Sequence, residues 1–188
     1  MTDTTKNDNA VTSTEGVTAP IEYTLLKEAK ATKLSPKNRG ELTYQIAQHP
    51  DSKKLFIRIL SNDTGGYFSK EWINVEAMQK VLIEQDKDKP LKSGIFKPLF
   101  TGGSSNNSGF CAAVCRAEKL LKPAPDSAFL HMLDKPFSEW LKSIEKLKPI
   151  GKAEDLTKPK AVAVDKTAST SSSTKPEAKP TKSKGVFD

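Results

Sequence analysis

Apolar and polar residues alternate along residues 42–47 and again along residues 55–60, which is the period of two expected of half-buried strands. Residues 49–52 lie between them and have the composition of a turn. The Asn-Asp-Thr-Gly-Gly run at 62–66 is a hairpin signal, because glycine adopts a positive φ without a Cβ clash. Residues 67–73 then read as a third strand. The pattern predicts an antiparallel meander.

Helical signals follow the meander. Asn74 can cap a helix that begins near Val75. The composition of residues 110–121 favours a helix with Ser108 as its cap, although a strand over 110–115 is an open alternative. A short helix is predicted at 127–133, and 95–100 read as an edge strand because of the proline there. The clearest helix is expected just after Pro136, where apolar residues recur at helical spacing: Phe137, Trp140, Leu141, Ile144 and Leu147.

These elements predict an α+β fold in which an antiparallel meander sheet packs against three to four helices. Residues 1–20 are polar and are expected to be a disordered arm. Residues 21–150 are expected to form a single α+β domain, onto which the first apolar cluster, at 21–26, docks. Residues 151–188 are rich in Lys, Thr, Ser, Pro and Ala and are expected to be a disordered, basic, low-complexity tail.

Charge and composition narrow the class of protein only partly. The 188 residues carry a net charge of +7 that is spread thinly along the chain, whereas a dedicated duplex-DNA binder shows a denser stripe. The start of the chain lacks the basic and apolar regions of a signal peptide, and the longest apolar run, at 110–115, is far too short to span a membrane. We therefore expect a soluble cytoplasmic protein without a membrane partner.

The cysteines and histidines give no metal or cofactor signal. Cys111 and Cys115 lie four residues apart, which is the wrong spacing for a CxxC redox or zinc motif, and only His49 and His131 could add ligands. On a helix this spacing favours two small buried apolar residues in a reducing compartment. No nucleophile has a sequence partner that would activate it, so an enzyme is the less favoured class and no cofactor is expected.

The meander carries the first functional hypothesis. If Leu55, Ile57 and Ile59 face the core, the outward face holds aromatic and basic groups that could stack bases and follow a phosphate backbone. The order of strands and helix is similar, at the level of fold alone, to small single-strand-binding modules. The alternative is that helices cover this face and make Phe56 and Leu60 core residues. The candidate nucleic-acid-binding residues are Lys53, Lys54, Phe56, Arg58, Tyr67 and Lys70.

A second hypothesis concerns the small polar residues ahead of the helix at 110–121. A helix start behind such residues can present free backbone N–H groups to a phosphate. The Walker pattern fails here, because Phe110 stands where a lysine should follow Gly109, so this anion site is the basis of a minor, enzymatic alternative. Its candidate residues are Gly102, Gly103, Ser104, Ser105, Ser108 and Gly109.

A third hypothesis is a protein–protein regulatory or inhibitory factor, of a kind common in phages, plasmids and other mobile elements. A compact domain with a flexible arm at each end suits such a role. Recognition segments could lie at 21–26 and at 185–188, where an isolated Val-Phe pair adjoins an aspartate. The sequence favours nucleic-acid binding slightly over this alternative, and leaves the oligomeric state open.

Overall fold

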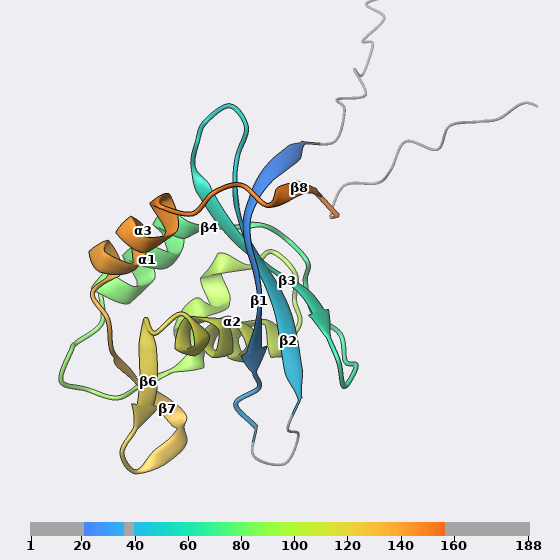
Figure 1. The fold of residues 1–188 in the computed structure, drawn as a ribbon. Helices are drawn as coiled ribbons and strands as arrows, with labels where there is room; N and C mark the ends of the chain where they lie inside the picture. Colours follow the sequence, from blue (N-terminus) through green and yellow to red (C-terminus); the bar gives the residue numbers. More distant parts are fainter. Residues whose placement is uncertain (1–20, 36–39, 157–188) are drawn as a thin grey trace, which may run out of the picture.

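A computed structural model describes residues 21–35 and 40–156 of the chain. These residues form a five-stranded antiparallel sheet, a three-stranded sheet and helices, which confirms the α+β prediction (Figure 1). The elements in chain order are β1 (Glu22–Thr32), β2 (Glu41–Gln48), β3 (Leu55–Asn62), β4 (Ile73–Asn74), α1 (Val75–Ile83), β5 (Leu91–Lys92), the 3₁₀ helix η1 (Ser93–Leu99), α2 (Asn106–Ala117), β6 (Leu121–Ala124), β7 (Ser127–Leu133), α3 (Phe137–Glu145) and β8 (Gly151–Glu154).

The large sheet has the strand order β4-β3-β2-β1-β8, so the predicted meander is present and the last strand returns to lie beside the first. Every pairing is antiparallel. Leu26 is an extra residue in β1, since Leu25 pairs with Ala47 and Lys27 with Ile46. The bulge shifts the alternation: Tyr23 and Leu25, before it, belong to a small cluster on one face, whereas Ala29 and Ala31, after it, face the main core together with Leu26.

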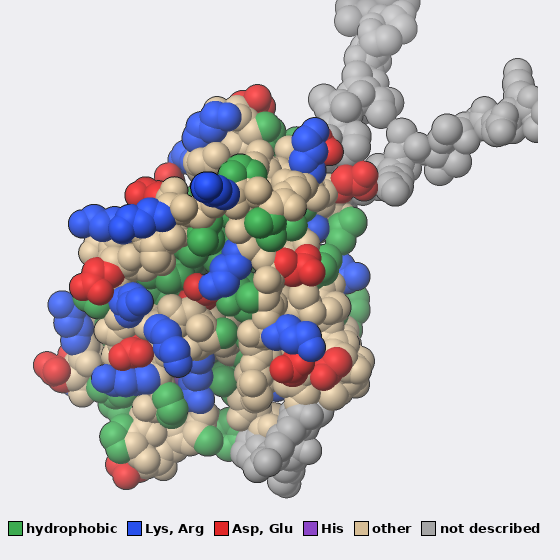
Figure 2. All heavy atoms as spheres, in the orientation of Figure 1, with side chains coloured by type: hydrophobic (Ala, Val, Ile, Leu, Met, Phe, Trp, Pro, Cys, Tyr) green, Lys and Arg blue, Asp and Glu red, His purple; other side chains and the backbone are tan. Residues whose placement is uncertain are grey.

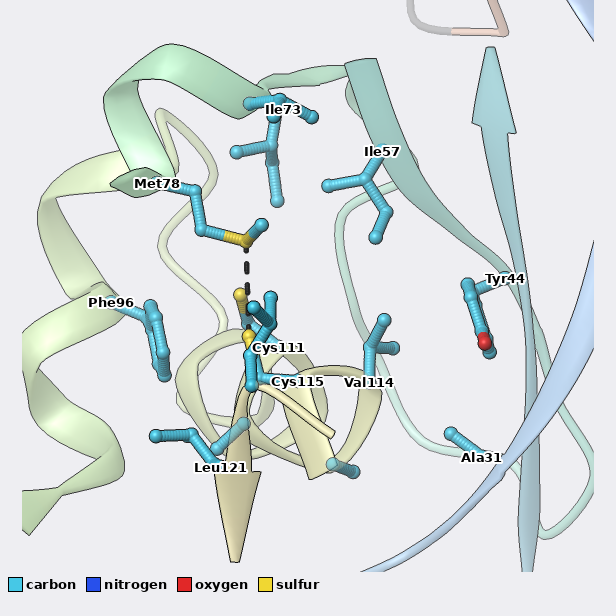
Figure 3. Packing of buried hydrophobic residues seen from close by; sticks show 14 of the residues in the cluster. Ala31, Tyr44, Ile57, Ile73, Met78, Phe96, Cys111, Val114, Cys115 and Leu121 are labelled. Carbon is cyan, nitrogen blue, oxygen red and sulfur yellow. Dashed lines mark hydrogen bonds between the residues drawn. The ribbon is translucent and has the colours of Figure 1, made fainter. Parts of the chain in front are cut away.

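All the helices pack on the same face of the large sheet, which we call the inner face (Figure 1). Leu42, Tyr44 and Ile46 from β2 and Ile57 and Ile59 from β3 point into this core, as the alternation predicted. Figure 3 shows how helical side chains meet them. The opposite, outer face carries only a small apolar cluster, to which no described helix contributes a residue.

Three of the predicted helices are present. The Asn74 side chain accepts hydrogen bonds from the backbone N–H groups of Glu76 at 2.7 Å and Ala77 at 3.3 Å, so it caps α1. The stretch after residues 101–105, which we call the Gly-rich loop, is helix α2 rather than a strand. Helix α2 begins at Asn106 rather than after Ser108. Helix α3 buries Trp140 and Ile144, and it ends before Leu147.

Three predicted elements are wrong. Residues 67–72 are not a strand, because hydrogen bonds with the loop before α2 and with the start of α2 hold them: the Ser69 N–H donates to Asn107 and the Tyr67 carbonyl accepts from Ser104. Residues 95–100 fall mostly in η1, and the proline there sits inside that helix. Residues 127–133 form β7, not a helix, because they pair with both β5 and β6. The last error has a general cause: short apolar runs do not distinguish a strand from a helix.

The domain also differs from the prediction at its ends. Residues 21–26, a candidate recognition segment, lie almost wholly in β1, where Tyr23 and Leu25 are buried. The fold continues past residue 150, since Gly151–Glu154 pair with β1 and bury Ala153. With a single apolar side chain, that strand leaves little pattern to detect. The predicted arm at 1–20, most of the predicted tail and the candidate segment 185–188 lie outside the described residues.

Candidate functional site

The outer face of the large sheet was the predicted nucleic-acid surface, and the structure places a ring cluster there. We call it the outer-face cluster; its members are Tyr23, His49, Phe56, Arg58 and Trp72. The Tyr23 ring stacks on Trp72 with centroids 4.7 Å apart, and it meets the edges of Phe56 and His49 at 5.4 and 5.5 Å. These rings therefore pack largely against one another and form a small second core.

Arg58 lies on the predicted face but is not free to meet a ligand. The residue is only 3% exposed. Its Nε donates to the side chain of Gln45 at 2.8 Å, and its Nη1 donates to the backbone carbonyl of Glu154 at 2.6 Å. Its guanidinium lies 4.2 Å from the centre of the Trp72 ring. Burial lowers the pKa of Arg58 from its usual value. The Arg58 guanidinium, which was expected to bind phosphate, thus helps to hold β8 against the sheet.

The other predicted nucleic-acid residues are scattered. Lys53 and Lys54 lie in the β2–β3 turn, where Lys54 pairs with Glu76 at 2.9 Å. Tyr67 is 78% exposed, but it follows the turn at the opposite end of β3 (Figure 1). Lys70 lies 5.9 Å from the ring of Phe68, which packs against the inner core. The structure therefore does not bring these side chains together on one surface.

Charge on the molecular surface is mixed. On the face seen in Figure 2, lysine and arginine side chains are interspersed with acidic ones and form no continuous basic stripe. Several exposed lysines are paired, such as Lys30 with Glu41 at 2.6 Å and Lys152 with Glu22 at 2.6 Å. Such pairing leaves less positive charge for a polyanion.

The Gly-rich loop, the predicted anion site, already holds an anion from the same chain. The Glu71 carboxylate accepts from the N–H of Thr101 at 3.1 Å, the N–H of Gly102 at 3.2 Å, the hydroxyl of Thr101 at 2.5 Å and the hydroxyl of Ser69 at 2.7 Å. Partial burial acts to raise the pKa of Glu71, but these hydrogen bonds outweigh it and lower the pKa. An external phosphate would have to compete with this carboxylate for the same donors.

Two other residues at that loop are also hydrogen-bonded to a neighbouring segment. The Ser104 hydroxyl and the Asn106 amide both donate to the carbonyl of Tyr67, at 2.6 and 2.9 Å. Ser105 stands at the cap position of α2 but makes no capping hydrogen bond with its side chain. Gly103, Ser108 and Gly109 complete the predicted set, with Ser108 and Gly109 inside the first turns of α2. Buried Asn107 links the loop to Ser69, a contact that the sequence did not reveal.

One serine–histidine contact resembles that of a catalytic serine, but the hydrogen bond runs in the opposite direction. Nδ1 of buried His131 accepts from Nε of Arg116 at 2.9 Å, and its Nε2 lies 2.8 Å from the Ser93 hydroxyl. With Nδ1 accepting, a neutral ring carries its proton on Nε2 and donates it to Ser93. Burial and the neighbouring Arg116 lower the pKa of His131 to about 4. A general base for serine needs the opposite arrangement.

The two cysteines behave as the sequence predicted. Both are buried and free, and Sγ of Cys115 lies 3.8 Å from Sδ of Met78 (Figure 3). A hydrogen bond with Cys111 and burial raise the pKa of Cys115 well above its usual value, so the thiol is not activated. Among the described residues, no group of three or more His, Cys, Asp or Glu side chains is placed to hold a metal ion.

A further candidate ligand site on the surface is an apolar groove between the end of α1 and the start of α3. We call it the α1–α3 groove. Buried Leu82 and Leu120 and partly buried Leu133 and Phe137 line it, together with Ile83, which is 67% exposed. The remaining lining residues are Gln79, Gln85, Lys87, Asp134, Lys135, Pro136 and Ser138.

The groove arises from how two helices end. Helix α1 turns Val75, Met78 and Leu82 inward, and Ile83, one residue further along the helix, points away from that stripe. Helix α3 begins with Phe137, whose ring lies 5.0 Å from that of buried Trp140. The sequence analysis missed this site, although one signal was present: Ile83 is an apolar residue off the buried face of its helix.

Comparison with protein-family models, curated protein sequences and solved structures gave no match to this chain, so the functional argument depends on the residues themselves. In the described part of the chain, no helix has both the length and the apolar character needed to cross a membrane.

Proposed function

We propose that this protein is a non-enzymatic binding factor that recognises another protein through the α1–α3 groove. The observation that carries the proposal is the exposure of Ile83 above a floor of buried leucine and half-buried phenylalanine. When a partner covers an isoleucine that is 67% exposed beside other apolar groups, apolar surface is removed from water, which stabilises the complex. Short apolar segments of partner proteins commonly dock in grooves of this kind.

The other candidate surfaces support this ranking because most of their polar groups are bonded within the fold, with the exception of Nε1 of Trp72, which is buried without a hydrogen-bond partner among the described residues. The rings of the outer-face cluster pack on one another, and its arginine is hydrogen-bonded within the fold. The Gly-rich loop is held by Glu71. The groove, in contrast, exposes apolar surface with no partner among the described residues that covers Ile83.

A peptide-display selection on the immobilised full chain tests the proposal. Peptides that bind the unchanged protein are counter-selected on an Ile83→Asp variant, which places a charge in the lining of the groove. We expect enriched peptides that bind the unchanged protein at least about tenfold more tightly than the variant. A matched control is Ile150→Asp, since Ile150 is also exposed (61%) but does not line the groove. Peptides that bind all three proteins equally would contradict the proposal.

Single-stranded nucleic-acid binding is the second candidate, and one observation favours it. No described helix contributes to the cluster on the outer face of the sheet, and Phe56 there is only partly buried. Lys53 and Lys54 lie near it in the β2–β3 turn. A base could stack on the exposed part of Phe56 while the two lysines meet the adjoining phosphates.

A salt series with a labelled oligonucleotide tests this candidate. Phosphate-driven binding weakens linearly on a log–log plot as the salt concentration rises. Phe56→Ala and the double change Lys53→Ala, Lys54→Ala should each reduce affinity, whereas Lys92→Ala, which changes a lysine in the separate three-stranded sheet, should not. If the oligonucleotide does not bind even at low salt, this candidate fails.

A further inference from the structure

The charges of the α1–α3 groove indicate what kind of segment it would take. Three charged side chains line it: Lys87, Asp134 and Lys135. The Asp134 carboxylate lies 3.8 Å from Nζ of Lys122, so its charge is partly balanced within the protein. Neither Lys87 nor Lys135 forms an ion pair with any described residue. The uncompensated charge at the rim is therefore positive.

The helix ends that border the groove change this charge balance little. The carbonyls near the end of α1 are satisfied, since Lys80 accepts from the N–H of Glu84 at 3.3 Å and Val81 accepts from the side chain of Gln85 at 2.9 Å. The start of α3 has Pro136 at its cap position and no capping side chain. The first turn of α3 already contains an acidic residue, Glu139, whose N–H donates to the Pro136 carbonyl at 3.0 Å, so neither helix end adds a strong charge to the groove.

We propose that the partner segment combines apolar side chains with at least one aspartate or glutamate, which would meet Lys87 and Lys135. The proposal rests on the proposed function, since it assumes that the groove is the binding surface. Apolar side chains of the partner cover Ile83 and Phe137, and the carboxylate lies at the lysine rim, where opposite charges meet. The partner is then an acidic, apolar stretch of another protein.

Other occupants fit the groove less well. A basic segment would bring its cations against Lys87 and Lys135, and like charges at an interface oppose binding. A nucleic acid would find two cations, but its bases and sugars would not match a surface of leucine, isoleucine and phenylalanine side chains. The same rim charges therefore discriminate between partners as well as attracting one.

The test uses the full chain and labelled peptides taken from the display selection. Each peptide is compared with a version in which Asp is replaced by Asn and Glu by Gln. The protein variants are Lys87→Glu with Lys135→Glu, and a control, Lys92→Glu with Lys97→Glu, that makes the same charge change at lysines outside the groove lining. Affinity is measured by fluorescence anisotropy at two salt concentrations, with circular dichroism to show that each variant is folded.

We expect the groove variant to bind the acidic peptides about tenfold or more weakly than the control variant does, and to lose most of their salt dependence. We also expect the neutralised peptides to bind the unchanged protein more weakly than their acidic parents. Peptides that depend on Ile83 yet bind equally well after neutralisation would overturn this inference and leave the proposed function standing. Peptides that ignore Ile83 would overturn the proposed function itself.

Discussion

Glu118 is a buried carboxylate that joins several elements. It is 7% exposed and accepts hydrogen bonds from Nζ of Lys27 at 2.7 Å, from Nε1 of Trp140 at 2.8 Å and from the hydroxyl of Tyr44. Its partners come from β1, β2 and α3, and it stands at the end of α2. A buried charge with three donors is costly to remove, because the donors lose their shared acceptor.

We therefore expect Glu118→Ala to lower the free energy of unfolding by about 3 kcal/mol. The matched control is Glu41→Ala, which removes an exposed carboxylate paired with Lys30 and should cost less than about 1 kcal/mol. Urea denaturation of the two variants measures the difference. Equal losses would show that the contacts of Glu118 contribute no more than a surface ion pair.

His131 gives the fold a dependence on pH. Its pKa is lowered to about 4 by burial and by Arg116, while in the unfolded chain it is near the usual 6.5. Because the folded pKa is depressed, the unfolded state binds the proton first, and this contribution to stability is lost as pH falls from about 6.5 to about 4. The loss from this residue is at most about 3 kcal/mol.

Urea denaturation at pH 7 and pH 4.5 tests this for the unchanged protein and a His131→Gln variant. The variant should be less stable at pH 7, but its stability should fall less between the two pH values. The same fall in both proteins would mean that other groups cause the acid sensitivity.

For single residues, the sequence predicted which face of the sheet a side chain points to better than it predicted how deeply that side chain is buried. The alternation in β3 correctly placed Ile57 inward and Arg58 outward. It could not show that Arg58 would be buried by Trp72 and by a strand almost a hundred positions later in the chain. Contacts between distant segments, such as Arg58 with Glu154, leave no local pattern.

Among the elements, the loop before α2 depends on one side chain. Glu71 supplies the acceptor for Thr101 and Gly102, and in its absence these backbone N–H groups would turn to solvent. We expect Glu71→Ala to speed amide hydrogen exchange in residues 101–103 and to cost about 1–3 kcal/mol of stability. The control is Glu76→Ala, which removes a carboxylate that is exposed beside Lys54.

The same contacts bear on the enzymatic alternative. At low millimolar concentration, where the general stabilising effect of phosphate salts is small, inorganic phosphate should not raise the melting temperature of the unchanged protein beyond the effect of chloride at equal ionic strength, because Glu71 already uses the loop donors. Thermal unfolding in the two salts decides this. A specific rise with phosphate would mean that an external anion displaces the carboxylate, and would revive the predicted anion site.

Elements with strong local signals were predicted correctly, whereas two strands that depend on pairing with distant segments were missed. The Asn74 cap of α1 and the apolar stripe of α3 each depend on residues that are close together in the sequence. In contrast, residues 127–133 became a strand because β5 and β6 lie on either side of them. The strand at residues 151–154 likewise depends on the edge of β1. Tertiary pairing decided these cases against local preference.

For the molecule as a whole, the fold separates two kinds of surface. One face of the large sheet carries the helices, and the other carries the outer-face cluster, whose rings pack against one another. The groove belongs to the helical side, at the meeting of α1 and α3. The sequence predicted the layers but not the groove, because the groove exists only when two helices distant in sequence are brought to the same place.

The central claim is that the α1–α3 groove is the surface that meets a partner. Its most direct test is to follow the backbone amide signals of the isotopically labelled full chain by NMR during titration with a display-selected peptide. The account predicts that the largest shifts fall on residues that line the groove, such as Leu82, Ile83, Leu133 and Phe137. Shifts concentrated instead on β3 and the β2–β3 turn would contradict it and favour the outer face.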